Sequence, residues 1–404
     1  MQYKLRSLAA ALGALAASCA SAASTEVRIT SAPLADIEFD SARDGDYCPS
    51  CNFGDGNSRL TFTDVDGRLW VAQVDWRSGR FIPADGKGTL VDTNAAYFVD
   101  FGNGPSWSFS QRGSELVYTR YRDGVPADPA NAGLGWARMT GPGAWAAGPV
   151  PDGLGRVAPK GTQHRDDAVA RVSYGATARD AAWWRIGDFS APEVPLPLGD
   201  SNRGLGLRWV GGTNQILLSG APDGVVKQIF VHDTVTGSTE QITDGPGNKR
   251  AQFMFFPPEF GGEAIFFVVA DDLRFDFYRK RPDDHGVPRW TRFQSLTLPA
   301  DKPYIAGSPE AFVHNGRSWI VLTMAASDAA AALSDIALLA IDPARPELRR
   351  LTDASSPPRW RSDPEYFIND RGVYVYYTRA RLRRALTVHE GIWRVDTGLG
   401  PALR

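Results

Sequence analysis

The sequence predicts an all-β protein, a single β-propeller of about seven four-stranded blades. Two motifs recur along the chain at one spacing, and a third indication is the composition. The 404 residues include 41 Gly, 28 Pro, 12 Trp and 20 Phe, which is typical of many short strands joined by turns. The chain is longer than the usual single domain, and radial repetition of blades accounts for that length.

The first motif is an alternating strand that ends in Asp and is followed by Gly within a few residues. Clear copies are residues 69–75, 229–233 and 392–396, and weaker copies are 184–188 and 336–342. Six intervals of roughly 53 residues, the size of a four-stranded blade, separate Asp75 from Asp396. Seven blades fit this spacing, and six blades are the alternative.

The second motif is a turn, a strand, a Gly turn and a strand of aromatic and β-branched residues. Copies begin at Gly104, Pro258, Ser308 and Asp363, and the last three contain Pro-Glu at Glu259, Glu310 and Glu365, spaced 51 and 55 residues apart. Each copy has the period-2 pattern of a hairpin, and Pro at the start of a strand forfeits no ladder hydrogen bond. Two independent motifs thus give one period.

Two segments fit the repeat less simply. Residues 325–339 are rich in Ala and Leu and favour a helix by propensity. The repeat overrides that preference and predicts a loop at 329–332 and a strand at 336–341. Residues 124–200 fit the repeat least well, and stretches such as Gly141-Pro142-Gly143 predict long surface loops there.

The ring of blades is expected to close through the N-terminal part of the domain. An unpaired last blade would leave two sheet edges exposed. We therefore expect residues between Thr25 and Phe39, especially Val27 to Thr30, to pair with the C-terminal blade.

The N-terminus predicts export from the cytoplasm. Lys4 and Arg6 precede an apolar run, and Ala20-Ser21-Ala22 has the small-x-small pattern of a cleavage site. We expect residues 1–22 to be a signal peptide and residues 23–404 to form the propeller, in the periplasm or secreted. No apolar run reaches the roughly 20 residues that span a bilayer, which predicts a protein without a membrane span.

The charge balance argues against a nucleic-acid partner. Without Lys4 and Arg6, the chain has 42 of its 44 basic residues and 46 acidic residues. Nucleic-acid-binding domains, in contrast, are typically strongly basic. No Gly-x-Ser-x-Gly elbow, phosphate loop or dinucleotide fingerprint is present in the sequence, which argues against serine-hydrolase and nucleotide-dependent functions. We expect a monomer.

One repeat resembles that of TolB-type β-propellers. It is Asp233-Thr234-Val235-Thr236-Gly237 followed by Gln241-Ile242-Thr243-Asp244-Gly245, with a second copy at Arg350-Leu351-Thr352-Asp353. Trp107-Ser108 with Gly113 resembles the inner hairpin of that family, and the resemblance covers most of residues 57–400. It implies the fold and leaves function open, because such propellers include protein-binding modules, gating domains of peptidases and polysaccharide-cleaving enzymes.

Four carboxylates are the candidate catalytic residues: Glu310, Glu259, Asp363 and Glu365. The first strand of a propeller blade lines the channel, so we expect these side chains to converge there. Glycoside cleavage needs one carboxyl group as a proton donor and one ionised partner. Residues 308–312 and 363–365 resemble the strand starts that carry catalytic carboxylates in arabinanase-type propeller glycosidases, although this chain differs in blade number. The alternative is that each Glu accepts backbone hydrogen bonds and maintains the fold.

A lyase would use a different group of residues. It needs a base such as His or Tyr near an Arg that neutralises a uronate carboxylate. His164, Arg165 and Tyr174 are the local group of that kind, and a solvated loop is the alternative interpretation.

The cysteines and one acidic segment bear on cofactors. Cys48 and Cys51 predict a local disulfide in an oxidising compartment, with a structural Zn²⁺ as the alternative. Cys19 lies in the leader, where it lacks the large aliphatic residue of a lipidation site three positions earlier. A structural Ca²⁺ is a further alternative at five oxygen-bearing residues, although they form no twelve-residue Ca²⁺ loop: Asp40, Asp44, Asp46, Asp55 and Asn57.

Two functions follow from these residues. The first is an exported propeller that recognises a glycan at its central channel and, in the stronger form of the hypothesis, cleaves it as a glycoside hydrolase or polysaccharide lyase. The second is a non-catalytic, TolB-like propeller that binds an envelope protein through its loops. The partner is therefore predicted to be a carbohydrate or an envelope protein.

Overall fold

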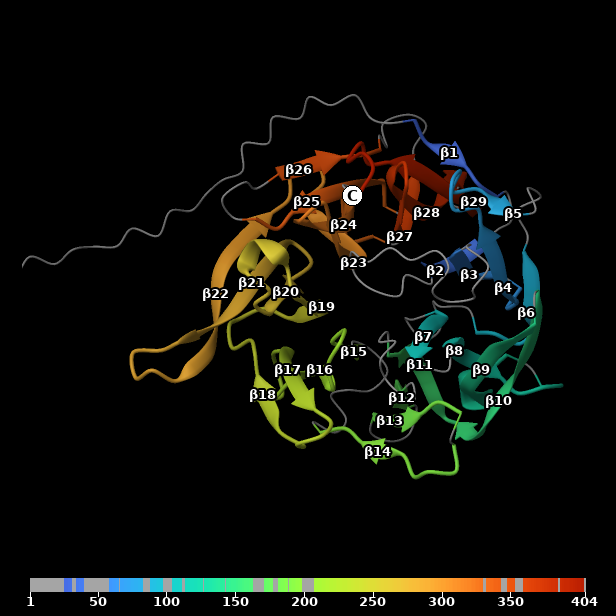
Figure 1. The fold of residues 1–404 in the computed structure, drawn as a ribbon, viewed down its shortest axis with the longest axis horizontal. Helices are drawn as coiled ribbons and strands as arrows, with labels where there is room; N and C mark the ends of the chain where they lie inside the picture. Colours follow the sequence, from blue (N-terminus) through green and yellow to red (C-terminus); the bar gives the residue numbers. More distant parts are fainter. Residues whose placement is uncertain are drawn as a thin grey trace, which may run out of the picture.

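The strands form seven antiparallel sheets around a central axis, which confirms the predicted seven-bladed propeller. The computed structural model describes residues 25–30, 34–39, 58–64, 66–82, 88–96, 104–110, 113–125, 127–141, 143–162, 171–176, 181–187, 189–197, 207–329, 332–342, 347–352, 359–383 and 386–402. Figure 1 shows the blades in chain order around the ring, with the first strand of each nearest the axis.

The first three blades come from the N-terminal half of the chain. Blade I contains β2 (Leu34–Phe39), β3 (Ser58–Asp64), β4 (Leu69–Val74) and β5 (Phe81–Ile82), with β6 (Thr89–Asp92) also paired to β4. Blade II contains β7 (Ser106–Ser110), β8 (Gly113–Tyr121), β9 (Ala132–Gly141) and β10 (Ala144–Leu154), with η1 (Pro129–Asn131) before β9. Blade III contains β11 (Arg156–Gly161), β12 (Arg171–Ala176), β13 (Ala182–Arg185) and β14 (Val194–Pro195).

The remaining four blades complete the ring. Blade IV contains β15 (Arg208–Trp209), β16 (Gln215–Gly220), β17 (Gln228–Asp233) and β18 (Thr239–Gln241). Blade V contains β19 (Lys249–Phe255), β20 (Ile265–Ala270), β21 (Arg274–Pro282) and β22 (Pro288–Thr297), with η3 (Pro258–Phe260) between β19 and β20. Blade VI contains β23 (Tyr304–His314), β24 (Arg317–Ala325), β25 (Ser334–Ala340) and β26 (Glu347–Arg350). Blade VII contains β27 (Trp360–Asn369), β28 (Gly372–Arg383), β29 (Leu386–Asp396) and β1 (Val27–Arg28).

The N-terminal strand closes the ring, as predicted. β1 pairs antiparallel with β29, with Val27 opposite Arg394 and Arg28 opposite Trp393. The backbone N–H of Ile29 adds a hydrogen bond of 2.9 Å to the carbonyl oxygen of Ile392. The first and last strands of the described chain therefore share one sheet, and the outer edge of β29 is covered.

The hydrophobic core lies between neighbouring blades. All six residues of β20 are buried, because a second strand is covered on both faces by adjacent sheets. Its Phe267 packs with Phe253 at 5.5 Å between ring centroids and belongs to the core shared with blade VI. Burying a side chain of this size contributes about 1.5–3 kcal/mol to stability, so each interface between blades is a principal source of stability.

The segment with high helix propensity forms strands, as the repeat predicts. β24 ends at Ala325 and β25 spans Ser334–Ala340, where every residue is buried. Burial between two blades outweighs the weak intrinsic preference of Ala and Leu for a helix. The expectation of a long loop around Gly141 is wrong. β9 ends at Gly141 and β10 begins at Ala144, so that this stretch turns tightly between two long strands.

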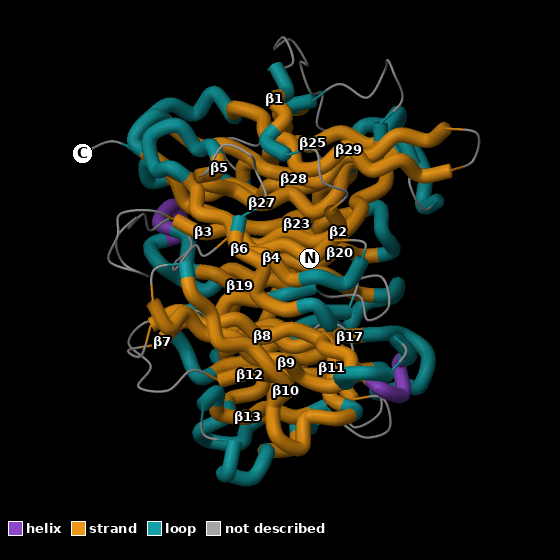
Figure 2. The backbone as a smooth tube through the Cα atoms, turned by 90° about the vertical axis from the view of Figure 1, so that its right-hand side faces the viewer, coloured by secondary structure: helices purple, strands orange, loops and turns teal. Residues whose placement is uncertain are grey.

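The connections lie on two opposite faces of the ring. Because neighbouring strands are antiparallel, connections from first to second and from third to fourth strand share one face, which we call the cleft face. Connections from second to third strand and between blades share the other, which we call the entry face. Figure 2 shows loops gathered on both sides of the stacked strands. Along the described chain no helix is both long and apolar enough to cross a membrane.

Candidate functional site

Four innermost strands share a bulge at equivalent positions. In β11, β19, β23 and β27 the register with the second strand shifts, and one residue within the shifted stretch has a left-handed backbone: Ala158 (φ 53°), Ala251 (φ 50°), Gly307 (φ 68°) and Asp363 (φ 55°). Non-glycine residues rarely adopt this backbone, and a bulge redirects the side chains that follow it. Pairing resumes at equivalent residues of the four blades: Lys160, Phe253, Glu310 and Glu365.

A buried basic residue precedes the bulge in three blades, two positions before the left-handed residue: Arg156, Lys249 and Arg361. The ammonium group of Lys249 donates to the carbonyl oxygens of Gly245 and Pro246 at 3.0 and 2.9 Å. Burial lowers the pKa of this amine, and the nearby carboxylates oppose the change. The cation anchors the loop that enters blade V. We did not predict these residues, although a basic residue recurring at the start of three innermost strands could have indicated them.

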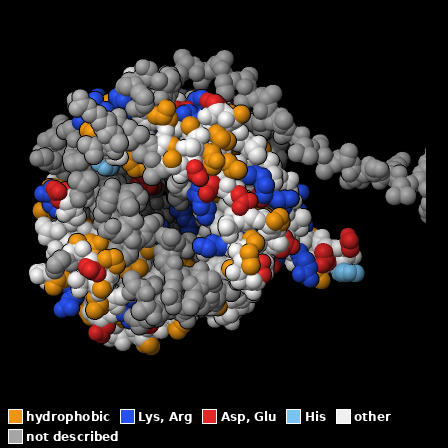
Figure 3. All heavy atoms as spheres, turned by 180° about the vertical axis from the view of Figure 1, so that it is seen from behind, with side chains coloured by type: hydrophobic (Ala, Val, Ile, Leu, Met, Phe, Trp, Pro, Cys, Tyr) orange, Lys and Arg blue, Asp and Glu red, His pale blue; other side chains and the backbone are white. Residues whose placement is uncertain are grey.

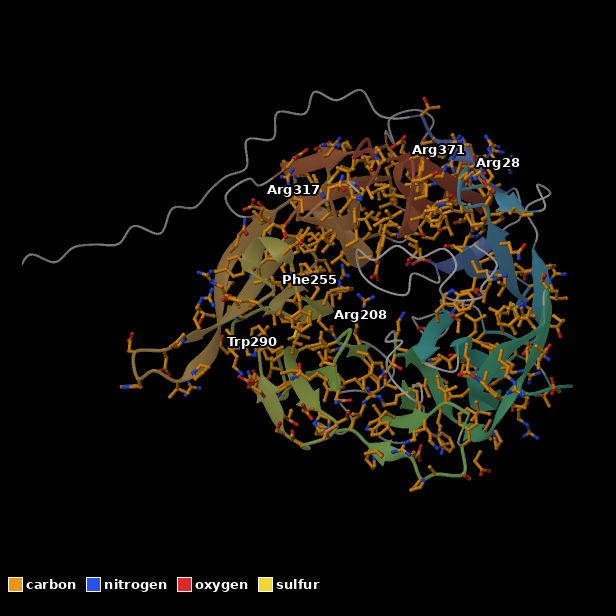
Figure 4. All side chains as sticks on the ribbon, viewed as in Figure 1. Arg28, Arg208, Phe255, Trp290, Arg317 and Arg371 are labelled. Carbon is orange, nitrogen blue, oxygen red and sulfur yellow. The ribbon has the colours of Figure 1, made fainter. Side chains whose placement is uncertain are left out.

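Glu310 lies just after its bulge and is held by Arg208 in a two-point ion pair. The Nη1 and Nη2 atoms of Arg208 lie 3.1 and 2.5 Å from the two carboxylate oxygens. The guanidinium also lies 4.4 Å from the ring centroid of Phe253, so that blades IV, V and VI meet at this pair. Figure 4 shows Arg208 directed from β15 toward the centre of the ring.

This arrangement makes Glu310 a hydrogen-bond acceptor. Both carboxylate oxygens receive N–H groups of Arg208, whereas a general acid must present a proton to its substrate. The side chains of Arg208 and Glu310 are only 20% and 17% exposed. Sequence reasoning identified Glu310 but missed Arg208, which lies two blades away.

Glu259 does not occupy the expected position at the start of an innermost strand. It lies in η3, between the first and second strands of blade V. Its carboxylate accepts hydrogen bonds from the backbone N–H of Ser318 and from the Ser318 hydroxyl, the latter at 2.6 Å. Glu259 thus joins blade V to β24 of blade VI, and Phe253 takes the position equivalent to Glu310.

Asp363 and Glu365 do lie on an innermost strand. Asp363 adopts the left-handed backbone of the bulge in β27, and Glu365 pairs across the sheet with Tyr376. Both side chains are half-buried. The structure therefore places Glu310, Asp363 and Glu365 on two adjacent innermost strands, and Glu259 apart from them. Figure 3 shows a hollow at the centre of the ring with Lys and Arg side chains beside it.

Of the other predicted residues, Tyr174 is buried and the rest lie outside the described residues. Tyr174 is buried in β12, and burial, with Glu193 as a hydrogen-bond partner, raises the pKa of its hydroxyl. His164 and Arg165, Cys48 and Cys51, and the acidic segment between residues 40 and 57 lie outside the described residues. Among the residues that are described, no three His, Cys, Asp or Glu side chains gather in a way that could hold a metal ion.

A cleft of about 700 Å³ opens between blades IV and V, on the cleft face. Its apolar wall is formed by Met254, Phe256 and Trp290, and its polar wall includes the side-chain amides of Asn214 and Gln215. These two amides make no hydrogen bond to the part of the chain that the structure describes. The indole N–H of Trp290 is buried and likewise has no acceptor among those residues.

Two ion pairs border this cleft. Lys280 of β21 lies 2.7 Å from Glu240 of β18, and Arg281 lies 2.7 Å from Glu263. The ammonium group of Lys280 is also 6.0 Å from the ring centroid of Trp290. Figure 4 shows Trp290 at the base of the β21–β22 hairpin, which extends beyond the ring in Figure 1. Sequence reasoning did not identify this cleft, which arises where two blades meet.

Comparison with known proteins assigns neither a family nor an activity to this chain. No family model matches the chain, and no curated protein matches it in sequence. Similar solved structures include the propeller domain of Cps50 (Swd1) from Myceliophteria thermophila, at 10% identity over 92% of this chain and 98% of that one, TM-score 0.49. The periplasmic gluconolactonase PpgL of Pseudomonas aeruginosa matches at 14% identity over 83% and 94%, TM-score 0.49. TolB from Acinetobacter baumannii matches at 13% identity over 84% and 79%, TM-score 0.39.

Proposed function

We propose that this protein is an exported propeller that binds a glycan, and that the glycan occupies the cleft between blades IV and V. The observation that carries the proposal is the combination of an aromatic wall with unused polar groups in one concave site. Trp290 and Phe256 offer apolar surface, while the side-chain amides of Asn214 and Gln215 offer hydrogen-bonding groups.

Sugars match such a site because they too are amphipathic. A pyranose ring presents C–H groups on its faces and hydroxyl groups around its edge, so that it packs on an aromatic ring and exchanges hydrogen bonds with amides and carboxylates. Ligand sites in proteins combine a mostly apolar lining with a few polar groups, in volumes of roughly 300–1,000 Å³. The cleft falls within that range at about 700 Å³.

The carboxylates favour binding over cleavage. Glu240 and Glu263 at the cleft are paired with Lys280 and Arg281, and Glu310 in the channel is paired with Arg208. Hydrolysis of a glycosidic bond requires one carboxyl group that is kept protonated. We therefore propose recognition without cleavage at this site.

A screen of neutral and acidic oligosaccharides, followed by calorimetry on the best ligand, tests the proposal. Trp290→Ala should weaken binding roughly tenfold, because stacking of a sugar ring on an aromatic side chain contributes on the order of 1 kcal/mol or more. Gln215→Ala should weaken it roughly fivefold, the value of one hydrogen bond. Glu310→Gln is the matched control for the channel and should leave the affinity unchanged.

Three outcomes would contradict the proposal. A glycan whose affinity responds to Glu310→Gln and not to Trp290→Ala would place the ligand in the central channel. Release of sugar products by the wild-type protein would establish cleavage. A folded protein that binds no glycan but captures an envelope protein through the β21–β22 hairpin would support the alternative, protein-binding function.

A further inference from the structure

We propose that the glycan is a neutral, linear polysaccharide, with one unit in the cleft between blades IV and V and further units along the β21–β22 hairpin. This inference rests on the proposed function, because it continues the ligand outward from that cleft. It adds the class of glycan, the direction in which the chain leaves the cleft, and a contact surface beyond Trp290.

The β21–β22 hairpin is longer than the ring requires. β22 has ten residues, whereas the fourth strands of the neighbouring blades IV and VI, β18 and β26, have three and four. β22 exceeds the longer of them by six residues, which is roughly 20 Å of strand. Figure 1 shows the hairpin extending outward from the ring. Because the adjacent blades complete their sheets with much shorter fourth strands, this length is available for a contact outside the ring.

One face of the hairpin continues the apolar wall of the cleft. Lys280 pairs with Trp290, and Pro282 pairs with Pro288 at the next equivalent position of the ladder. Side chains two residues apart in a strand lie on the same face, so both proline rings share the face of Trp290. The two prolines are exposed and lie roughly 7 Å beyond Trp290 along the strands. That step is similar to the length of one sugar unit.

A strip of apolar rings at this spacing matches a linear chain of sugars. Each pyranose unit presents C–H groups on its faces, which pack on the indole of Trp290 and on the rings of Pro282 and Pro288. A monosaccharide in the cleft would leave both prolines in water. A chain of several units would cover them, and each covered ring adds apolar contact.

The tip of the hairpin is held in one shape before a ligand arrives. One carboxylate oxygen of Asp283 accepts hydrogen bonds of 2.9 Å from the backbone N–H groups of His285 and Val287. The other carboxylate oxygen accepts one of 3.0 Å from Nε of Arg289. A surface that is already ordered loses less conformational entropy on binding, so a modest apolar contact can still contribute to affinity.

The charges of the hairpin favour a neutral chain. Three of its cations each lie within 3.0 Å of a carboxylate: Lys280 at 2.7 Å from Glu240, Arg281 at 2.7 Å from Glu263, and Arg289 at 3.0 Å from Asp283. A sugar carboxylate would compete with these acids for the same N–H groups. A neutral hydroxyl group can instead donate to the acid and accept from the base of one pair.

The dependence of affinity on chain length tests this inference. The full-length protein is titrated by calorimetry with cello-, xylo- and laminari-oligosaccharides, each from the disaccharide to the hexasaccharide. In the series that binds best, affinity should rise roughly fivefold from the disaccharide to the hexasaccharide, the value of one stacking contact. Pro282→Ser combined with Pro288→Ser should abolish this rise and leave the disaccharide affinity within twofold.

A shortened hairpin provides a second variant. Replacing residues 282–288 by Asn-Gly joins Arg281 to Arg289, which lie opposite each other in the ladder, through a two-residue turn. This variant should also bind the hexasaccharide no more tightly than the disaccharide. Trp290→Ala should weaken binding of every length by a similar factor, because the unit in the cleft is common to all of them. Unchanged melting temperatures would show that each variant is folded.

The matched control is the residue next to Pro288. Val287 is apolar and 46% exposed. Its carbonyl oxygen accepts a hydrogen bond of 2.9 Å from the backbone N–H of Asp283, so the ladder continues to this residue and its side chain lies on the opposite face from Pro288. Val287→Ser should leave the affinities for the disaccharide and the hexasaccharide within twofold.

The possible failures separate this inference from the proposed function. Equal affinity for all lengths, or a rise that survives the loss of both prolines, would overturn the inference and leave the glycan site between blades IV and V intact. Tighter binding of alginate oligosaccharides, which carry a carboxylate on every unit, would overturn the neutral class. Loss of the rise in Val287→Ser would show that the contact lies elsewhere on the hairpin. A folded wild type that binds no oligosaccharide of any length would overturn both proposals.

Discussion

Two boundaries between blades, one between IV and V and one between VI and VII, show how differently the same repeat can be used. At the first, two exposed ion pairs border an open cleft with an apolar wall, and Glu240 and Glu263 each have one basic partner. At the second, the ion pairs are largely buried, and Glu26 and Glu390 each contact more than one arginine. The strands at both boundaries follow the same antiparallel order.

The difference shows that the repeat determines the backbone and leaves the chemistry to the side chains where blades meet. Every blade needs an apolar interface on both faces, so the core residues can vary little in character. The side chains at the ends of the strands are free of that requirement, and in this chain they produce an open cleft with exposed ion pairs on one face and a largely buried network of ion pairs on the other. Function should accordingly be sought at boundaries between blades.

The largest effect is expected where the second boundary also closes the ring. Deleting residues 366–404 removes β28 and β29. Among the described strands, β29 is the only one that pairs with β1. We expect no cooperative thermal transition, because blades I and VI would each face solvent with an apolar sheet. A soluble truncated protein with a native-like melting curve by circular dichroism would contradict this prediction.

A smaller but still large effect is expected from Glu26→Gln. Glu26 accepts two hydrogen bonds from Arg361, at 2.9 and 2.8 Å, and one from Tyr377 at 2.5 Å, while Arg361 is only 1% exposed. Removing one partner of a buried ion pair costs roughly 3 kcal/mol, because the other charge is left uncompensated. Urea denaturation at pH 7 measures the loss.

The same residue predicts a pH dependence. Although burial opposes it, the hydrogen bonds and charge of Arg361, with Tyr377 and Arg379, hold the pKa of Glu26 below its usual value. A carboxyl group with a lowered pKa stabilises the fold above the pKa of the unfolded chain and loses that contribution as the pH falls through the folded value. The stability difference between wild type and Glu26→Gln should therefore shrink below about pH 4. A constant difference down to pH 3 would contradict this assignment.

An intermediate effect is expected in the channel. Glu310→Gln leaves Arg208 with an amide in place of a carboxylate, at a pair that is about four-fifths buried. We expect a loss of roughly 1 kcal/mol and a melting temperature lowered by a few degrees. If Glu310 were instead the general acid of a glycosidase, the variant would keep its melting temperature and lose roughly a hundredfold in activity.

The smallest effect is expected at the cleft. Lys280 and Glu240 are each 42% exposed, and exposed pairs contribute about 0–1 kcal/mol. Lys280→Ala should therefore leave the unfolding midpoint almost unchanged while it alters glycan affinity. Glu26→Gln, in contrast, should lower stability and leave glycan affinity unchanged. Differential scanning calorimetry and ligand titration on one protein batch would show whether one boundary affects stability and the other affects ligand affinity.

The features that could be predicted from sequence are those that each blade repeats. The Asp-Gly turns after β4, β17 and β29, the alternation of buried residues, and the need to close the ring are local or topological, so a single chain displays them. Even the strand at Ser334–Ala340 followed from the repeat, against the helix propensity of its residues.

The features that could not be predicted depend on neighbours distant in sequence. Arg208 and Glu310 are separated by 102 residues, and nothing near either residue indicates the other. Glu259 matches the Pro-Glu motif in sequence, yet its hydrogen bonds lead to Ser318 in the next blade. The cleft beside Trp290 is a property of two blades together, so no motif within either one describes it.

Ring closure also determines how late in synthesis the fold can be completed. Arg28 is among the first described residues to leave the ribosome, and Glu390, to which it bonds, follows 362 residues later. At a translation rate of roughly 5–20 residues per second, the synthesis of β29 follows that of β1 by on the order of 20–70 s. Until then the growing chain is an open arc with two apolar ends, and only the last few dozen residues to be made convert it into a ring.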